Sequence, residues 1–324
     1  MKTAAGHRLF DWFYKYGTLL TIALLIVIFG LATDHFLSGT NIVTILRSIS
    51  IVTIIAVGLT VSLAVGGFDL SIGSTASLAN AVVLSMFVWY GQSFGVGILV
   101  GLLFSLAVGL VNAFLVIKFK MQDMLMTLAT MFVFQGVALT YSRGATISQN
   151  MILPNGDYAT GQIPAAFSAL GKVPWIIIVM LVVVLAAHLF LTHTKHGRYM
   201  YMIGGNSEAA KLTGIAVSKY RLLAYVISAL LAGLGGIVLG ARVMSAEVNS
   251  GAPYLMDAVA AAFIGYSVFG AGKPNPFGTF AGAVLIGVLS NGLIMLSVPY
   301  YAMDIVKGAV LAAALAITYY KRSH

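Results

Sequence analysis

The feature that most constrains this chain is a series of long apolar runs with almost no charged residues inside them. Of its 324 residues, 60% are hydrophobic and only 8% are charged, whereas a soluble domain carries about 25% charged residues. Too few charges remain to cover a water-exposed surface of this size. Because a membrane-spanning helix needs about 20 consecutive apolar residues, the pattern predicts a polytopic, all-α membrane protein.

The apolar runs predict one transmembrane domain over residues 1–324, a bundle of about ten helices surrounded by a lipid bilayer. The segment Gly66–Asp69 interrupts what would otherwise be one long apolar region. The candidate spans extend over residues 18–33, 45–65, 72–90, 97–117, 123–141, 174–192, 222–241, 255–270, 277–296 and 302–318.

The distribution of Lys and Arg predicts the orientation of the bundle. With the N-terminus in the cytoplasm, thirteen of the 18 basic residues fall in inner segments and four in outer ones, with Lys307 inside the last span. Cytoplasmic loops carry an excess of positive charge, so both termini are expected in the cytoplasm. Residues 142–173 then form a long external loop, and residues 192–221 form a basic cytoplasmic loop. Topology accounts for the net charge of +9, and no nucleic-acid partner is expected.

Small residues recur along single helix faces, which predicts close contacts between helix backbones in lipid. We interpret these faces as tight static packing, with sliding during gating as the alternative. The residues concerned are Gly97, Gly101, Ser105, Gly109, Gly236, Gly240, Gly278 and Gly282.

A weak internal similarity predicts an inverted repeat of five helices. Residues 109–113 (Gly-Leu-Val-Asn-Ala) and 287–292 (Gly-Val-Leu-Ser-Asn-Gly) each end a span. Each is followed by a span with an aspartate near its start, Asp123 and Asp304. An odd number of spans per half would insert the second half upside down, as in inverted-repeat transporters.

No catalytic signature is found in the sequence. Residues 270–274 (Gly-Ala-Gly-Lys-Pro) lack the spacing and the hydroxyl residue of a phosphate-binding loop. Cysteine is absent, and His188, His193 and His196 have no acidic or thiol companions at metal-site spacing. We therefore expect a chain that is not an enzyme and holds no cofactor or metal of its own.

Charged and polar residues inside the spans are the candidates for the translocation path, because an aspartate at the bilayer centre costs about 3 kcal/mol. Asp69 follows two glycines, and Asp69 or Ser71 is expected to cap the next helix; the alternative is a gate or cavity wall. Asn112 and Asn291 are expected to bond between helices or to a solute hydroxyl.

Three further charges complete this set. Asp257 near the start of its span is expected to be stabilised by the helix dipole. Asp304 and Lys307, three residues apart on one face, are expected to pair with each other. As an alternative, a lone ion-coupled transporter would use Asp69, Asp257, Asp304 and Lys307 as a relay.

The cytoplasmic loop carries a separate signal. Gly204 and Gly205 are expected to be flexible, Asn206 to cap a short helix, and Gly214 to end it. A short rigid helix that projects from the membrane suits docking into another protein. The alternative is a basic loop lying against lipid headgroups.

Five motifs in order resemble the ribose, xylose and arabinose class of ABC importer permeases, over nearly the whole chain. They lie at residues 66–73 (Gly-Gly-Phe-Asp-Leu-Ser-Ile-Gly), 203–215, 254–261 (Tyr-Leu-Met-Asp-Ala-Val-Ala-Ala), 278–283 and 290–293. The chain departs from that family at Leu255-Met256, at Gly265-Tyr266 and at residues 273–276, and these departures concern the solute more than the fold.

The resemblance implies a transport subunit in the bacterial plasma membrane, importing a monosaccharide by alternating access. A separate ABC ATPase would bind ATP and magnesium, an extracytoplasmic sugar-binding protein would deliver the solute, and two permease copies, identical or paralogous, would line one path. Related permeases serve nucleosides, riboflavin, a furanone signal or amino acids, and these solutes remain alternatives. The resemblance places ATPase coupling on Asn206, Ser207, Glu208, Ala209, Ala210, Lys211 and Gly214.

Overall fold

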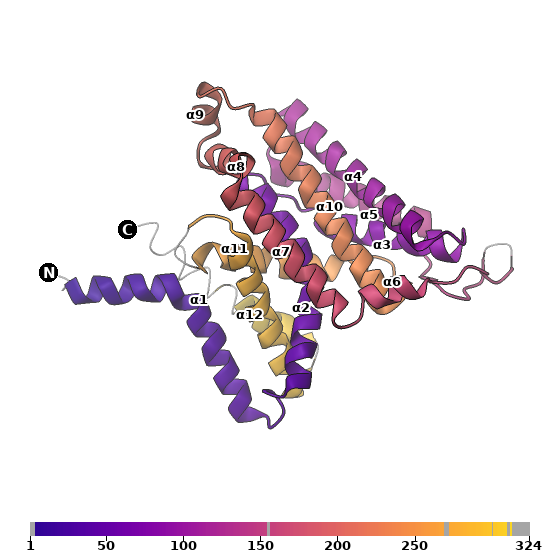
Figure 1. The fold of residues 1–324 in the computed structure, drawn as a ribbon, viewed down its shortest axis with the longest axis horizontal. Coiled ribbons are helices and arrows are strands. Elements are labelled where there is room, and N and C mark those ends of the chain that lie inside the picture. The colour runs from indigo at the N-terminus through magenta and orange to yellow at the C-terminus, as the bar shows by residue number, and fades with distance from the viewer. Residues whose placement is uncertain (1–3, 154–155, 269–271, 300, 310–311, 313–324) are drawn as a thin grey trace.

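The computed structural model describes residues 4–153, 156–268, 272–299, 301–309 and 312, with side chains from Tyr16 onward. This part of the chain is almost entirely helical, as predicted (Figure 1). The helices are α1 (Ala4–Ala32), α2 (Gly39–Ala64), α3 (Ile72–Val88), α4 (Phe94–Phe119), α5 (Asp123–Ser142), α6 (Ala165–Leu170), α7 (Trp175–His193), α8 (Lys195–Gly205), α9 (Ser207–Leu212), α10 (Val217–Val243), α11 (Ala252–Ser267) and α12 (Pro276–Met295). Residues 301–309 are also helical.

Nine of the ten predicted spans coincide with helices. In the described residues, α2, α4, α5, α7, α10 and α12 are long and apolar enough to cross a membrane, and shorter apolar helices cover Tyr16–Ala32, α3 and Ala252–Tyr266. This confirms a polytopic, all-α protein. Of the predicted tenth span, 302–318, residues 302–309 are helical and most of the remainder lies outside the described residues.

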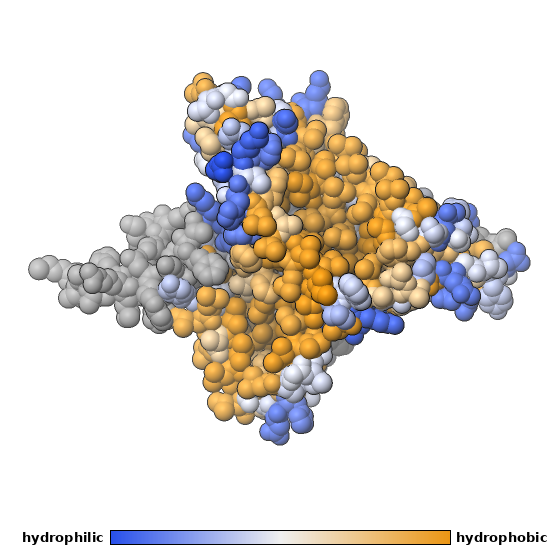
Figure 2. Space-filling model, in the orientation of Figure 1, coloured by the Kyte–Doolittle hydropathy of each residue, from blue (hydrophilic) through white to orange (hydrophobic). Residues whose placement is uncertain are grey.

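Helices α2, α3 and α10 form the centre of the bundle. The apolar windows of α2 and α10 are 67% and 61% buried, against 28% for α4, 17% for α5 and 22% for α7. The outer helices therefore expose apolar side chains such as Phe114 and Phe132 over a wide surface (Figure 2). An apolar surface of this extent is typical of a protein that contacts lipid or another apolar protein surface. Hydrophilic residues gather instead over α8 and α9 at one end and over the chain near α6 at the other.

The small-residue faces lie at helix contacts, which confirms the predicted close approach of helix backbones. A Cβ atom on Gly109 of α4 would lie 2.9 Å from the carbonyl oxygen of Tyr225 on α10. Gly236 of α10 lies against the backbone of Ala76 on α3, and Gly282 of α12 lies against that of Ala261 on α11. Any larger side chain there would force the helices apart.

The long connection at residues 142–173 is partly regular. Strand β1 (Ile147–Ser148) pairs antiparallel with β2 (Ser245–Ala246), with Ile147 opposite Ala246. A bridge between Ile152 and Tyr158, followed by α6, completes the connection among the described residues. The strand pair fixes the chain that leaves α10, at the end of the bundle opposite α9 (Figure 1).

Candidate functional site

Helix α9 is the short projecting helix expected from the sequence. The Asn206 side chain caps it by accepting a hydrogen bond from the Ala209 amide at 3.0 Å, and Gly214, with a φ of +85°, follows its end. Ala210 is 2% exposed and packs into an apolar cluster, whereas Leu212 is 89% exposed. One face is thus anchored while the other is free to contact a partner. The remaining residues of the predicted coupling set, Asn206, Ser207, Glu208, Ala209, Lys211 and Gly214, are exposed.

The expectation that Gly204 is flexible is wrong. Helix α8 continues through Gly205, and a Cβ atom on Gly204 would lie 2.5 Å from the carbonyl oxygen of Ala64 and 3.1 Å from the amide nitrogen of Gly66. The residue is glycine because two backbones meet there. The chain that leads into α9 therefore rests directly on the turn between α2 and α3.

Helix α8 also contacts the connection between α11 and α12. The Tyr201 hydroxyl donates a hydrogen bond to the carbonyl oxygen of Pro274 at 2.7 Å. Burial raises the pKa of Tyr201 to about 12, so the phenol stays neutral and keeps its proton for this bond. One short helix thus contacts the turns of two helix pairs.

The break between α2 and α3 encloses a fully buried carboxylate. Asp69 Oδ1 accepts hydrogen bonds from the Ser71 amide at 3.0 Å and from its hydroxyl at 2.7 Å, and Oδ2 accepts one from the Ser228 hydroxyl of α10 at 2.8 Å. The Ser71 hydroxyl in turn accepts a bond from Asn112 Nδ2 at 2.7 Å. Each carboxyl oxygen therefore has a hydrogen-bond donor, as a buried polar group requires.

This network decides two sequence predictions. Asp69 satisfies the amide that precedes α3, but Ser71 makes no side-chain bond to an amide of that helix, so only Asp69 acts in the expected way. Asn112 of α4 donates a hydrogen bond to Ser71 at the start of α3, as expected for a bond between helices. Asp69 is fully buried, so it lies within protein and not on the wall of a described cavity.

A second buried cluster joins the starts of α5 and α10. Arg221 Nη2 donates to both carboxylate oxygens of Asp123, at 2.9 and 3.0 Å, and the Tyr225 hydroxyl donates to Oδ2 at 2.6 Å. A Cβ atom on Gly67 would lie 2.9 Å from both Asp123 Oδ2 and the Tyr225 hydroxyl. The cluster therefore packs directly against the break between α2 and α3.

Helix α5 holds this break by a further contact. The Thr127 hydroxyl donates to the carbonyl oxygen of Phe68 at 2.8 Å and accepts from the amide of Leu70 at 3.1 Å. The non-helical backbone at the break thus finds partners inside the protein, which lipid could not provide.

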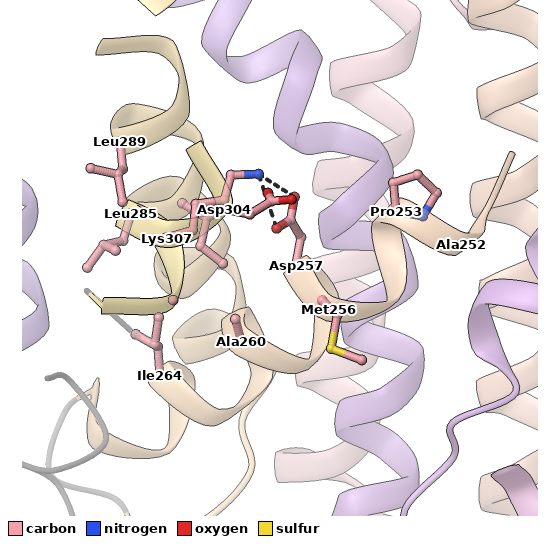
Figure 3. A pocket seen from close by; sticks show the side chains of 12 residues that line it. Ala252, Pro253, Met256, Asp257, Ala260, Ile264, Leu285, Leu289, Asp304 and Lys307 are labelled. Carbon is pink, nitrogen blue, oxygen red and sulfur yellow. Dashed lines mark hydrogen bonds and ion pairs between the residues drawn. The ribbon is translucent and has the colours of Figure 1, made fainter. Parts of the chain in front are cut away.

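The third polar group lines a cavity of about 480 Å³ between α11, α12 and the helical residues 301–309. Lys307 Nζ lies 3.3 Å from both carboxylate oxygens of Asp257, with Asp304 beside them (Figure 3). The predicted pairing of Lys307 with Asp304 is wrong, because Lys307 reaches across to α11. Asp257 lies in the second turn of α11, not in its first, so the helix dipole alone does not account for it.

Comparison with known proteins assigns the family. The profile of a family described as the permease component of a branched-chain amino acid transport system matches residues 41–315. The chain belongs to this family of permeases. It is 34% identical to the ribose import permease of Escherichia coli (strain K12) over 321 residues, 98% of each chain. It is 35% identical to the ribose import permease of Bacillus subtilis (strain 168), over 93% of this chain and 91% of that one.

A third relative is named for another sugar. The permease is 32% identical to the D-allose transport system permease of Escherichia coli (strain K12), over 94% of its own length and 91% of the relative's. No solved structure matches the chain.

The residues predicted to line the translocation path of the permease do not gather at one site. Asp69, Ser71 and Asn112 share one network, and Asp257, Asp304 and Lys307 share the cavity of Figure 3. Asn291 Oδ1 accepts a hydrogen bond from Asn41 Nδ2 at 3.0 Å, which joins α12 to the start of α2.

Sequence reasoning missed the clamp of Asp123, Arg221 and Tyr225 in the permease. A signal was present, because Arg221 and Tyr225 are four residues apart and share one face at the start of α10. Their partner lies 98 residues away in sequence, and nothing local indicates it.

Proposed function

We propose that this chain is the membrane subunit of an ABC importer that admits a simple sugar, with ATP hydrolysis performed by a separate subunit. The observation that carries the proposal is the 34% identity to a ribose import permease over 98% of both chains. The similarity to an allose permease broadens the solute class to monosaccharides. The permease forms the translocation path, and the separate ATPase subunit binds ATP and magnesium.

The partners follow from the same proposal. The exposed face of α9 docks into the ATPase, with both termini on that cytoplasmic side of the bacterial plasma membrane. The opposite end, near α6 and β1, receives solute from an extracytoplasmic binding protein. A second permease copy, identical or paralogous, completes the path. The exposed side chains of α9, above all Leu212, support the docking role.

The contacts around α9 supply a route for movement. The chain entering α9 rests on the break between α2 and α3 through Gly204, and the chain leaving it reaches the same break through Arg221 and Asp123. Displacement of α9 by an ATPase would therefore act on this break from two sides. Closely packed helices move as rigid bodies between discrete arrangements, which fits alternating access.

Uptake measurements test the proposal. A strain lacking the permease should lose accumulation of one labelled monosaccharide among ribose, xylose, allose and arabinose, and regain it with the wild-type gene. Loss of leucine or thymidine uptake instead would assign another solute. Concentrative uptake by the purified permease in liposomes, with an ion gradient and no ATPase, would replace the importer mechanism by a secondary one.

A further inference from the structure

A second cavity, of about 490 Å³, opens near β2 at the end of the bundle opposite α9. It lies between α3, the end of α10, the chain that links α10 to α11, and the first turns of α11. Its volume falls within the roughly 300–1,000 Å³ typical of small-molecule sites. The polar and aromatic residues that line it are Asn80, Ser245, Glu247, Asn249, Ser250, Tyr254 and Asp257.

The floor of this cavity lies beside the middle of α3. The Gly251 amide donates to the Ser77 hydroxyl at 2.9 Å, and Asn80 Nδ2 donates to the Ser250 hydroxyl at 3.0 Å. Ser77 and Asn80 lie in the interior of α3, several residues from either end. Ser250 is half-buried and lines the cavity, so a polar solute can reach it.

The linking chain is held rigidly in this position. The strand pair fixes it at Ala246, and the Ser77 and Asn80 bonds fix it at Ser250 and Gly251. A Cβ atom on Gly251 would lie 2.9 Å from the Ser77 amide nitrogen, so the loop and α3 are in direct contact. A preformed cavity loses little entropy when a solute binds.

The lining has the chemistry of a hydroxyl-binding site. Glu247 is exposed and lines the cavity, and its carboxylate can accept hydrogen bonds from hydroxyl donors. Tyr254 adds an aromatic surface, and the described lining contains no Lys or Arg.

This cavity shares part of its wall with the cavity of Figure 3. Pro253 and Asp257 line both cavities. The charge of Asp257 is balanced by Lys307, so the shared wall is polar without an unpaired carboxylate.

We propose that the cavity of Asn80, Glu247, Asn249, Ser250 and Tyr254 is the first solute subsite of the path, selecting neutral polyhydroxylated molecules through their hydroxyl groups. This inference rests on the proposed function, because it assigns the sugar a position within the permease.

The absence of cysteine from the permease permits a direct test. Val248 is 36% exposed and lines the cavity, so Val248→Cys should react with a membrane-impermeant maleimide in whole cells, with labelling measured on the purified permease. Ribose, xylose or allose should slow this labelling in a saturable way, while leucine and thymidine should not. Gln92→Cys, exposed at the same end outside the cavity, should be labelled at a rate that no sugar changes.

A second variant tests the hydroxyl contact. Glu247→Gln, combined with Val248→Cys, should raise the sugar concentration for half-maximal protection about tenfold, because a neutral amide oxygen accepts a hydroxyl hydrogen bond more weakly than a carboxylate does. Asp34→Asn, which removes an exposed carboxylate between α1 and α2, should leave that concentration unchanged.

Two outcomes separate this proposal from the function on which it rests. Unprotected labelling in cells that still accumulate sugar through the variant would overturn the subsite and leave the importer intact. If the wild-type permease supports no monosaccharide uptake, the proposed function fails and the subsite fails with it.

Discussion

Arg221, near the start of α10, binds both carboxylate oxygens of Asp123 at the start of α5, at 2.9 and 3.0 Å. The side chain of Asp123 is 10% exposed and that of Arg221 is 28% exposed, so the pair is largely shielded from water. Because the same cluster packs against Gly67, three segments distant in sequence are joined at one point. The segment that leads out of α9 enters the bundle there.

Removal of one partner should therefore damage both stability and coupling. Asp123→Ala leaves Arg221 and Tyr225 without their acceptor and should lower the free energy of unfolding by about 3 kcal/mol. Arg221→Lys keeps the charge but places a shorter, non-planar donor opposite Asp123, so its cost should be smaller. Thermal unfolding in detergent measures both variants, and equal melting temperatures for Asp123→Ala and wild type would contradict the clamp.

Helix α9 should transmit force only while it is intact. The Ala210 amide donates to the carbonyl oxygen of Asn206 at 3.0 Å, and Ala210→Pro removes this bond at a local cost of about 3 kcal/mol. We expect ATP hydrolysis without sugar uptake, at a normal amount of permease in the membrane. Glu208→Arg, which reverses a charge on the exposed face, should uncouple in the same way.

The control for this variant is Lys195→Pro, outside the coupling set. Lys195 is the first residue of α8, where proline is tolerated because that amide has no partner within the helix. Uptake should persist in this control. Normal uptake by both Ala210→Pro and Glu208→Arg would exclude a docking role for α9.

The two neighbouring glycines at the end of α8 should differ sharply in how far substitution by alanine destabilises the permease. A methyl group at Gly204 meets the backbone of Ala64, whereas nothing lies within 4 Å of a Cβ atom on Gly205. Gly204→Ala should destabilise the permease by about 1–3 kcal/mol, and Gly205→Ala should change stability by less than about 0.5 kcal/mol. Their melting temperatures compare the two sites directly, and similar values would contradict the contact of α8 with α2.

The sequence predicts the helices well because lipid leaves few alternatives. A backbone in a bilayer must satisfy its own polar groups, so the apolar runs of α4, α7 and α12 could only be helices. Local signals also predict α9, whose ends depend on the cap at Asn206 and on the positive φ of Gly214.

Contacts between side chains on different helices are harder to predict from the sequence. Helical spacing predicts that Lys307 pairs with Asp304, whereas its partner Asp257 lies on another helix 50 residues away. The two glycines before α9 were interpreted as flexible, but Gly204 is required by the backbone of α2, which no local pattern reveals. The inverted repeat stays a prediction.

Asp69 distinguishes an ATP-driven permease from an ion-coupled transporter. Asp69→Asn keeps the shape of the side chain and one acceptor oxygen for Ser71, and the Ser228 hydroxyl can turn to accept from the new amide. Its stability should fall by about 1 kcal/mol, and Asp69→Ala should cost more because it leaves buried donors unpaired. In an importer powered by ATP, the Asp69→Asn permease should still accumulate sugar, since no proton or ion has to pass through this carboxylate. If the variant inserts and melts normally yet transports nothing, Asp69 belongs to an ion relay, and the buried network has a role beyond holding α3 in place.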